Sequence, residues 1–269
     1  MNENRSGKVR VPAGFTLVEL MVSLIISMLL IIAIASLYLG QLRSYDTQSD
    51  LSLVQESARA IGQMLQRDAR QAGYTDYATL NRFGSATNII DAVNDQGTNS
   101  SDTLSFRFYG SSTPGAATAD GSIVDCTGTA AQNATLIFET YSVVTDATTG
   151  EPWLQCSVNG NAVRMFQGVE RLQVLFGEDT DGDLSIDRYV APGVANMANV
   201  RAALISVVIR GTTRSNVTAA SATVNHFGTV YAPGDVAPSN DTGSVSVVPA
   251  DGRLRKHFTY YVALRNRLN

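Results

Sequence analysis

Histidine, cysteine and tryptophan are scarce in this sequence, with two, two and one among 269 residues. His226 and His257 stand outside any H-E-x-x-H pattern, and no G-x-S-x-G, P-loop or C-x-x-C motif occurs. These absences remove the motif-based case for a zinc hydrolase, a serine esterase, a nucleotide-binding enzyme or a thiol oxidoreductase. We therefore interpret both histidines as structural residues and do not expect an enzyme.

Charged residues are also few, and basic residues do not outnumber acidic ones. Asp, Glu, Lys and Arg make up 16% of the chain, and the formal net charge is -4. A chain with this balance has no basic surface field to neutralise nucleic-acid phosphates. Nucleic acid is therefore not expected as a partner.

A long apolar run follows a short basic segment at the amino end. The run, residues 15–39, covers 25 residues and would reach roughly 37 Å as a helix, enough to cross a bilayer core of ~30 Å. Residues 1–14 carry a net charge of +2. No small-residue cleavage site interrupts the run, so we expect a single span that survives processing, with the basic segment in the cytoplasm and the rest outside.

Glu19 is the one acidic residue in this run. A carboxylate near the bilayer centre costs roughly 2.5–3.5 kcal/mol on insertion scales, so such residues usually have a function and a partner. The alternative is that Glu19 lies close to the membrane interface and extends its carboxylate toward water. Composition alone leaves both interpretations open.

The string Gly14-Phe15-Thr16-Leu17-Val18-Glu19-Leu20 resembles the class III signal of type IV prepilins and pseudopilins. The resemblance implies that a prepilin peptidase cuts after Gly14 and methylates the new amino terminus at Phe15. It also implies that Glu19 pairs with the terminal amine of a neighbouring subunit during assembly. An ammonium group is the partner that a carboxylate needs in a low-dielectric environment.

The helical pattern continues beyond the span with one apolar face. Apolar residues recur at spacings of three and four from Leu51 to Ala72, and Gly73 stands where a helix commonly ends. We therefore predict one helix from Phe15 to about Gln71. The amino-acid sequence of residues 57–74 resembles the helix end of PilW-type minor pilins.

The remainder is predicted to be strands and loops. β-branched and aromatic residues mark at least five strands, at 103–109, 134–144, 169–176, 200–210 and 257–264, and long polar loops fall at 75–101, 110–121 and 211–252. The prediction is an α+β, pilin-like fold with a largely antiparallel sheet. Its parts are a leader at 1–14, a helix at 15–73 and a β-rich domain at 74–269.

Cys126 and Cys156 are the only cysteines. With the globular domain outside the cytoplasm, an intradomain disulfide is the favoured state, and two free thiols are the alternative.

Acidic residues alternate along the segment from Asp179 to Asp187. Asp179, Asp181, Asp183 and Asp187 occupy the first, third, fifth and ninth positions of a calcium-loop pattern. Leu184 replaces the usual glycine, and Val190 stands where a bidentate acid belongs. The segment is therefore either a calcium site or a solvated acidic turn.

The leading hypothesis is a PilW-like minor pilin in a priming or tip complex that starts pilus assembly and supports adhesion and twitching motility. Its expected partners are prepilin peptidase, other minor pilins, the major pilin, a tip adhesin and inner-membrane lipid. The location would be the inner membrane with a periplasmic domain, then the pilus. The alternatives are a GspJ-like pseudopilin of a type II secretion system and a membrane-tethered, calcium-dependent adhesin.

Overall fold

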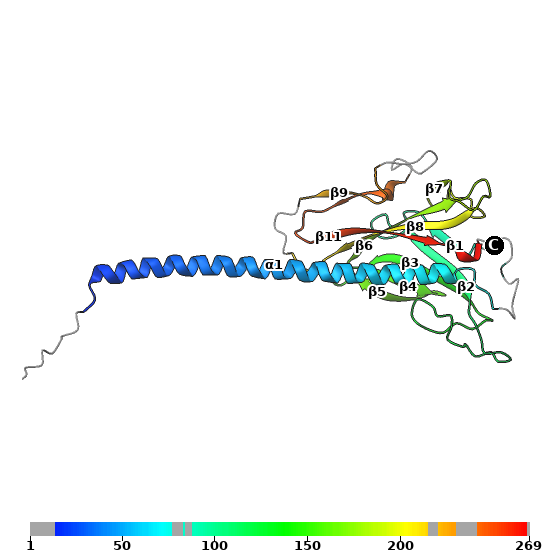
Figure 1. The fold of residues 1–269 in the computed structure, drawn as a ribbon, viewed down its shortest axis with the longest axis horizontal. Helices are drawn as coiled ribbons and strands as arrows, with labels where there is room; N and C mark the ends of the chain where they lie inside the picture. The colour runs from blue at the N-terminus through cyan, green and yellow to red at the C-terminus, as the bar shows by residue number, and fades with distance from the viewer. Residues whose placement is uncertain (1–13, 77–82, 84–87, 215–219, 230–240, 268–269) are drawn as a thin grey trace, which may run out of the picture. The chain divides into compact units, whose positions relative to one another are not determined.

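The computed structural model describes residues 14–76, 83, 88–214, 220–229 and 241–267. The chain forms two compact units, Met1–Asp46 and Thr47–Asn269. Most of the predicted leader, 1–14, and parts of the predicted loops 75–101 and 211–252 lie outside the described residues. Figure 1 gives the order of the elements along the chain.

One α-helix, α1, extends from Leu17 to Gln71. Its end agrees with the prediction, because Gly73 adopts a φ of +77° and its N–H donates to the carbonyl of Arg107 at 2.8 Å. The side chain of Asn266 donates to the carbonyl of Ala72 at 2.7 Å, which satisfies another group at the helix terminus.

The strands of the second unit form three antiparallel sheets. The five-stranded sheet follows chain order through β1 (Ile90–Val93), β2 (Thr103–Tyr109), β3 (Leu136–Thr145), β4 (Pro152–Val158) and β5 (Asn161–Gln167). The four-stranded sheet has the order β11 (Arg255–Ala263), β8 (Val200–Arg210), β6 (Val169–Glu178) and β7 (Arg188–Val190). A two-stranded sheet joins β9 (Ala222–Asn225) to β10 (Val245–Val248). Short 3-10 helices, η3 (Thr242–Ser244) and η4 (Arg265–Arg267), complete the described elements.

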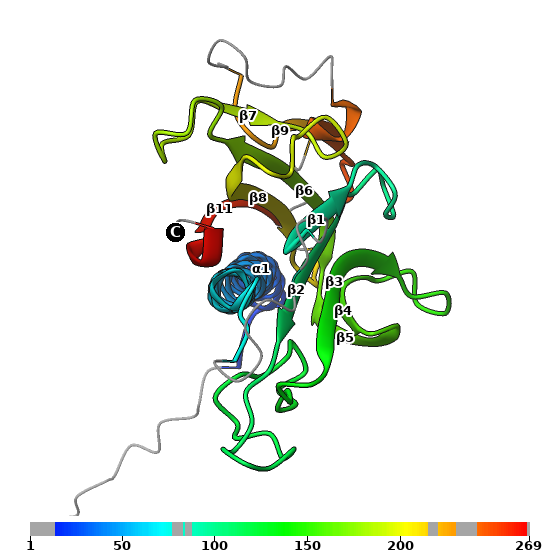
Figure 2. The same cartoon turned by 90° about the vertical axis from the view of Figure 1, so that its right-hand side faces the viewer.

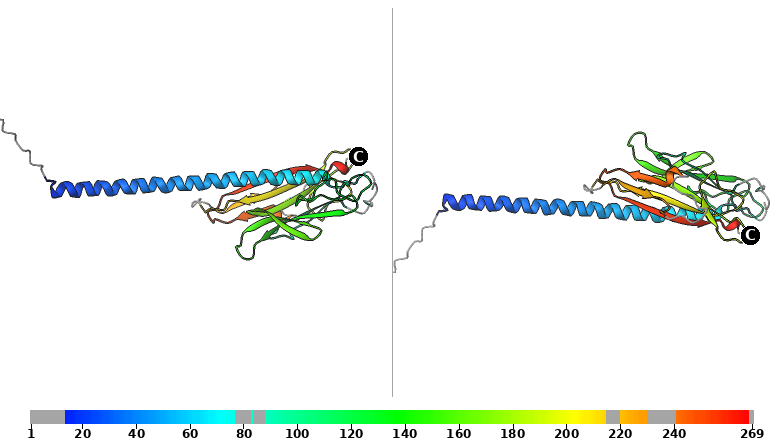
Figure 3. Two further views of the ribbon diagram at one scale, coloured as in Figure 1. Left: turned by 90° about the horizontal axis from the view of Figure 1, so that it is seen from below. Right: turned by 90° about the horizontal axis from the view of Figure 1, so that it is seen from above.

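The apolar stripe of α1 packs into the core of the second unit. Viewed along the helix, α1 lies between β11 and β2 (Figure 2), and Figure 3 shows the strands beside its cyan half. The predicted apolar positions from Val54 onward are buried, whereas Leu51 is only half-buried and Met64 is an additional buried residue. The buried predicted positions are Val54, Ala58, Ile61, Leu65, Ala69 and, just after the helix, Ala72. Gly62 is required here, because an added Cβ would lie 2.7 Å from the ring of Tyr260 on β11.

The five predicted strands correspond to β2, β3, β6, β8 and β11, and the fold class is confirmed. The structure adds strands where none was predicted, namely β1, β4, β5, β7, β9 and β10. The predicted loops at 75–101 and 211–252 were therefore wrong in part, since β1 lies in the first and β9 and β10 lie in the second. Most of these additions are short or exposed, so their sequences show little alternation, whereas β4 alternates from Leu154 to Val158 and was missed.

Candidate functional site

Thr16 and Glu19 cap the start of α1 reciprocally. One carboxylate oxygen of Glu19 accepts from the N–H and from the hydroxyl of Thr16, each at 3.0 Å. The Thr16 hydroxyl oxygen accepts in turn from the Glu19 N–H at 3.3 Å. This is the capping-box arrangement, and it holds the carboxylate within one helical turn of the Gly14–Phe15 peptide bond.

The first half of α1 exposes an apolar surface. Its large side chains from Leu17 to Leu39 are each about half exposed or more, and α1 is the one helix of the described residues that is long and apolar enough to cross a membrane. The hydroxyls of Ser23, Ser27 and Ser36 donate to main-chain carbonyls of the same helix at 2.7–2.9 Å. These hydroxyls therefore need no partner from the surroundings, which suits a lipid or filament interior.

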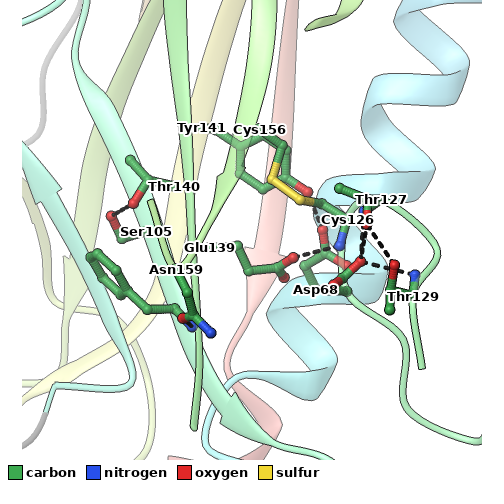
Figure 4. The surroundings of a disulfide bond; sticks show 12 residues. Asp68, Ser105, Cys126, Thr127, Thr129, Glu139, Thr140, Tyr141, Cys156 and Asn159 are labelled. Carbon is green, nitrogen blue, oxygen red and sulfur yellow. Dashed lines mark hydrogen bonds between the residues drawn. A yellow bond between two sulfur atoms is a disulfide. The ribbon is translucent and has the colours of Figure 1, made fainter. Parts of the chain in front are cut away.

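A disulfide joins Cys126 to Cys156 on β4, as predicted. Both residues are buried, and the bridge fastens the segment before β3 to the five-stranded sheet (Figure 4). The N–H of Cys126 donates to a carboxylate oxygen of Glu139 at 2.6 Å. The disulfide and the Glu139 carboxylate are therefore in direct contact through the Cys126 main chain.

Buried acids surround the disulfide (Figure 4). Asp68 of α1 accepts hydrogen bonds from the hydroxyl of Tyr141 and from Arg67 Nε, the latter at 2.8 Å. Glu139 is fully buried, and its second oxygen has no hydrogen-bond partner. Burial, reinforced by the Asp68 carboxylate, raises the pKa of Glu139 to about 9. Glu139 therefore holds a proton at neutral pH.

Two family models match this chain. Residues 140–266 match the family described as type IV pilus-assembly protein W, and residues 10–35 match the prokaryotic N-terminal methylation motif. The chain belongs to the type IV minor pilin family. No curated protein matches it. Among solved structures it is similar to the type IV-like pilin TTHA1219 from Thermus thermophilus, at 14% identity and a TM-score of 0.45, over 78% of this chain and 96% of that one.

The pilus-assembly model matches the part of this minor pilin from β3 onward, whereas the residues 57–74 that suggested the same family lie outside the match. The structure explains why particular residues occur at that helix end. Asp68 is the buried acceptor for Tyr141, and Arg67 also donates to the carbonyl of Asp125 at 3.2 Å. Arg70 faces outward. An ordinary amphipathic helix would not need an Arg-Asp pair at this position.

The acidic segment of the minor pilin that precedes β7 brings three of its four predicted ligands together. Oxygens of Asp179, Asp181 and Asp187 lie within 4.8 Å of one another, and Asp183 is outside this group. Leu184 has a φ of +70°, the conformation that a glycine would adopt at that position.

The carboxylates of this segment already have partners. Asp179 is paired with Arg201 Nε at 3.2 Å, and Asp187 accepts from the N–H and hydroxyl of Thr180, each at 2.6 Å. Glu178, the acid directly before this segment, is paired with Arg188 Nε at 2.7 Å. Calcium binding by this segment stays a prediction.

The two histidines form a hydrogen-bonded group with Ser206 on β8. The Ser206 hydroxyl lies 2.8 Å from His226 Nδ1 and 2.7 Å from His257 Nε2. Ser206 and His226 are fully buried, and burial lowers the pKa of His226 to about 3, with His257 adding to the effect. Because the Ser206 hydroxyl is buried and bonded to both rings, the arrangement is consistent with a structural role for the two histidines.

An exposed polar stripe runs along the second half of α1. Its members are Gln55, Arg59, Gln63, Gln66 and Arg70. Shallow hollows lie on both sides of it, one lined by Tyr261 and Arg265 and another by Ser122 and Ile123. Eight arginines of the second unit have a carboxylate partner, but within the described part of the chain Arg59 and Arg70 have no ion pair. From the sequence, the spacing of apolar residues indicates only that this face of the helix points away from the core.

Proposed function

We propose that this minor pilin is cut after Gly14 by a prepilin peptidase and methylated at Phe15. The helix of residues 15–39 then holds it in the inner membrane, with the second unit in the periplasm. The N-terminal methylation motif and the exposed apolar helix support this proposal. The membrane-embedded state keeps the apolar side chains out of water until assembly transfers them to a filament.

Glu19 is the observation on which the proposal depends. It is the one acid on an apolar helix surface, and its carboxylate is held beside Thr16. Cutting after Gly14 would leave an ammonium group on Phe15, close to this carboxylate in sequence. In a bundle of parallel helices, the carboxylate of one subunit and the amine of the next neutralise each other and select the register of insertion.

The assembled state we propose is a priming or tip complex of minor pilins that initiates the pilus and supports adhesion and twitching. The match to the pilus-assembly family supports this role. Other minor pilins, the major pilin and a tip adhesin are the proposed partners. The polar stripe of α1 supplies unpaired guanidinium groups for contacts with an adjacent subunit.

Replacing Glu19 with Ala tests the mechanism in the native host. We expect the variant to reach the membrane at normal levels but not to enter pili, and Ser23→Ala to behave as wild type because Ser23 bonds only within its own helix. The readouts are immunoblots of membrane and sheared-pilus fractions and counts of surface pili.

Deleting the gene tests the role. Surface pili should fall sharply, and should recover in part when pilus retraction is disabled, because a priming subunit matters less when pili are not withdrawn. Protein from the host that retains residues 1–14 and never enters a polymer would contradict the proposal. Normal pili combined with failed protein secretion would instead support the pseudopilin alternative.

A further inference from the structure

A hollow lies on the surface of the second unit where the end of α1 meets β11 and η4. Its lining residues are Gln66, Arg70, Tyr261, Val262, Ala263 and Arg265, and its volume is about 230 Å³. Asn266 fixes the arrangement, because its side chain donates to the carbonyls of Ala72 at 2.7 Å and of Arg70 at 3.4 Å. η4 is therefore held beside the last turn of α1 (Figure 2).

Two arginines of this hollow have no carboxylate beside them. Arg70 and Arg265 are both exposed, and within the described part of the chain neither forms a salt bridge, although eight other arginines of the second unit do. Tyr261, which lines the same hollow, is 52% exposed. Two unpaired guanidinium groups around an aromatic ring are complementary to a partner that carries carboxylates around an apolar side chain.

The turn between β6 and β7, residues 179–187, has that complementary character. Asp181, Asp183 and Asp187 are exposed, and none of them forms a salt bridge within the described residues. Leu184 stands among these acids, is 55% exposed and has a φ of +70°, a conformation that is strained for leucine and not for glycine. Its own domain buries less than half of this side chain, so the strained leucine is a separate indication that the turn contacts a partner.

The hollow and the acidic turn belong to opposite edges of one sheet. The four-stranded sheet has β11 at one edge and β7 at the other. Ala263 of the hollow pairs with Ala202 of β8, and Ala202 pairs with Gly177, just before the turn, so the two surfaces lie at the same end of the sheet. In one chain β11 and β6 are two strand spacings apart, roughly 10 Å. A second copy placed beside the first would bring its turn to the hollow at the same level.

We propose that this minor pilin binds a second copy of itself, with the acidic turn of one copy in the hollow of the next. Leu184 then lies against Tyr261, and the carboxylates of Asp181 and Asp183 face the two guanidinium groups. The contact is heterologous, so a pair of copies still has one free hollow and one free turn, and further copies can add. The inference rests on the proposed contact of the polar stripe with an adjacent subunit, and it names the partner and the residues of that contact.

Sedimentation velocity of the full chain in detergent tests the proposal, with chelator present so that no divalent cation occupies the acidic turn. We expect association that increases with protein concentration and weakens about tenfold between about 50 and 500 mM salt, because the contact is largely ionic. Arg70→Glu with Arg265→Glu reverses the charge of the hollow, and Asp181→Lys with Asp183→Lys reverses that of the turn. Each double variant alone should be monomeric, and an equal mixture of the two should associate as wild type does.

Two single variants separate docking from folding. Leu184→Gly removes the apolar side chain and relieves the backbone strain, so its Tm should equal or exceed that of wild type while association weakens. A folding defect would lower both. Arg59→Glu makes the same charge change on the same stripe, but roughly 16 Å along the helix from Arg70, so association should be unchanged.

Wild type that stays monomeric at low salt would overturn the proposal, and so would a mixture of the double variants that fails to associate. Association that persists in each double variant alone would come from the apolar helix and would also overturn it. The Glu19→Ala experiment is separate, because Glu19 belongs to neither the hollow nor the turn. Glu19→Ala protein that still enters pili would contradict the proposed mechanism of assembly and leave the result on self-association unaffected.

Discussion

The hydroxyl of Tyr141 on β3 donates a hydrogen bond to the carboxylate of Asp68 on α1, and both side chains are fully buried. Seventy-three positions separate the two residues in the chain. This bond ties the helix to the five-stranded sheet at the point where the disulfide also attaches. Several properties of the second unit should depend on it.

Tyr141→Phe should lower the free energy of unfolding by about 1.5–3 kcal/mol, because a buried carboxylate loses a donor and no water replaces it. Urea unfolding followed by circular dichroism measures the change. Tyr261→Phe is the matched control, since Tyr261 is 52% exposed and should change stability by less than about 0.5 kcal/mol. Equal effects of the two substitutions would contradict the role assigned to the buried bond.

Glu139→Gln should change how stability depends on pH. Burial raises the pKa of Glu139 to about 9 in the folded chain, against an ordinary value of 4.5, so folding favours its protonated form. Its contribution is fully present below the unfolded value and is lost as pH rises through the folded value. Between about pH 5 and 9, wild type should therefore lose stability relative to the variant, by on the order of 1 kcal/mol per pH unit at most.

Urea midpoints at pH 5, 7 and 9 measure this difference. Glu56→Gln, on an exposed position of α1, should follow the wild-type curve. Parallel curves for wild type and Glu139→Gln would show that Glu139 ionises normally in the folded domain.

Removing the disulfide with Cys126→Ser and Cys156→Ser together should cost about 3–4 kcal/mol in the chain-entropy model for a separation of 30 residues. The comparison is urea unfolding with and without reductant. Reductant should lower the stability of wild type and leave the double variant unchanged. Wild type that is insensitive to reductant, although its thiols become accessible to mass labelling, would contradict a stabilising role.

Much of the fold could be predicted because its strongest signals are local. The end of α1 was found through apolar spacing and Gly73, and β2 and β8 were found with their observed bounds because buried β-branched and aromatic residues dominate them. The methylation motif matches residues 10–35, a continuous stretch that includes Gly14 to Leu20, so no tertiary knowledge was needed to recognise it.

The missed strands have weaker local patterns. β5 is almost wholly exposed and shows no alternation of apolar and polar residues. β4 does alternate from Leu154 to Val158, so this strand had a usable signal that the prediction missed. The β9–β10 pair joins segments separated by more than fifteen residues of Ser, Thr, Gly and Pro-rich sequence. Pairing across such a distance is set by packing on neighbouring sheets and not by the turn itself.

The buried polar groups could be predicted only with knowledge of the strand register. Glu139 shares the inward face of β3 with Ile137, Tyr141 and Val143, and this alternation was a usable sign that an acid points into the core. No such sign exists for the contact between the Asn94 amide and Asp241, because these residues lie far apart in the sequence and only the folded chain brings them together.

Asn266 closes the carboxyl end of α1 from 194 positions further along the chain. The end of this helix thus depends on a residue that is remote from it in the sequence. β11, just before Asn266, must also pair with β8 before the sheet is whole. The distal end of α1 should therefore be secured late in folding, only after contacts between residues far apart in the sequence have formed.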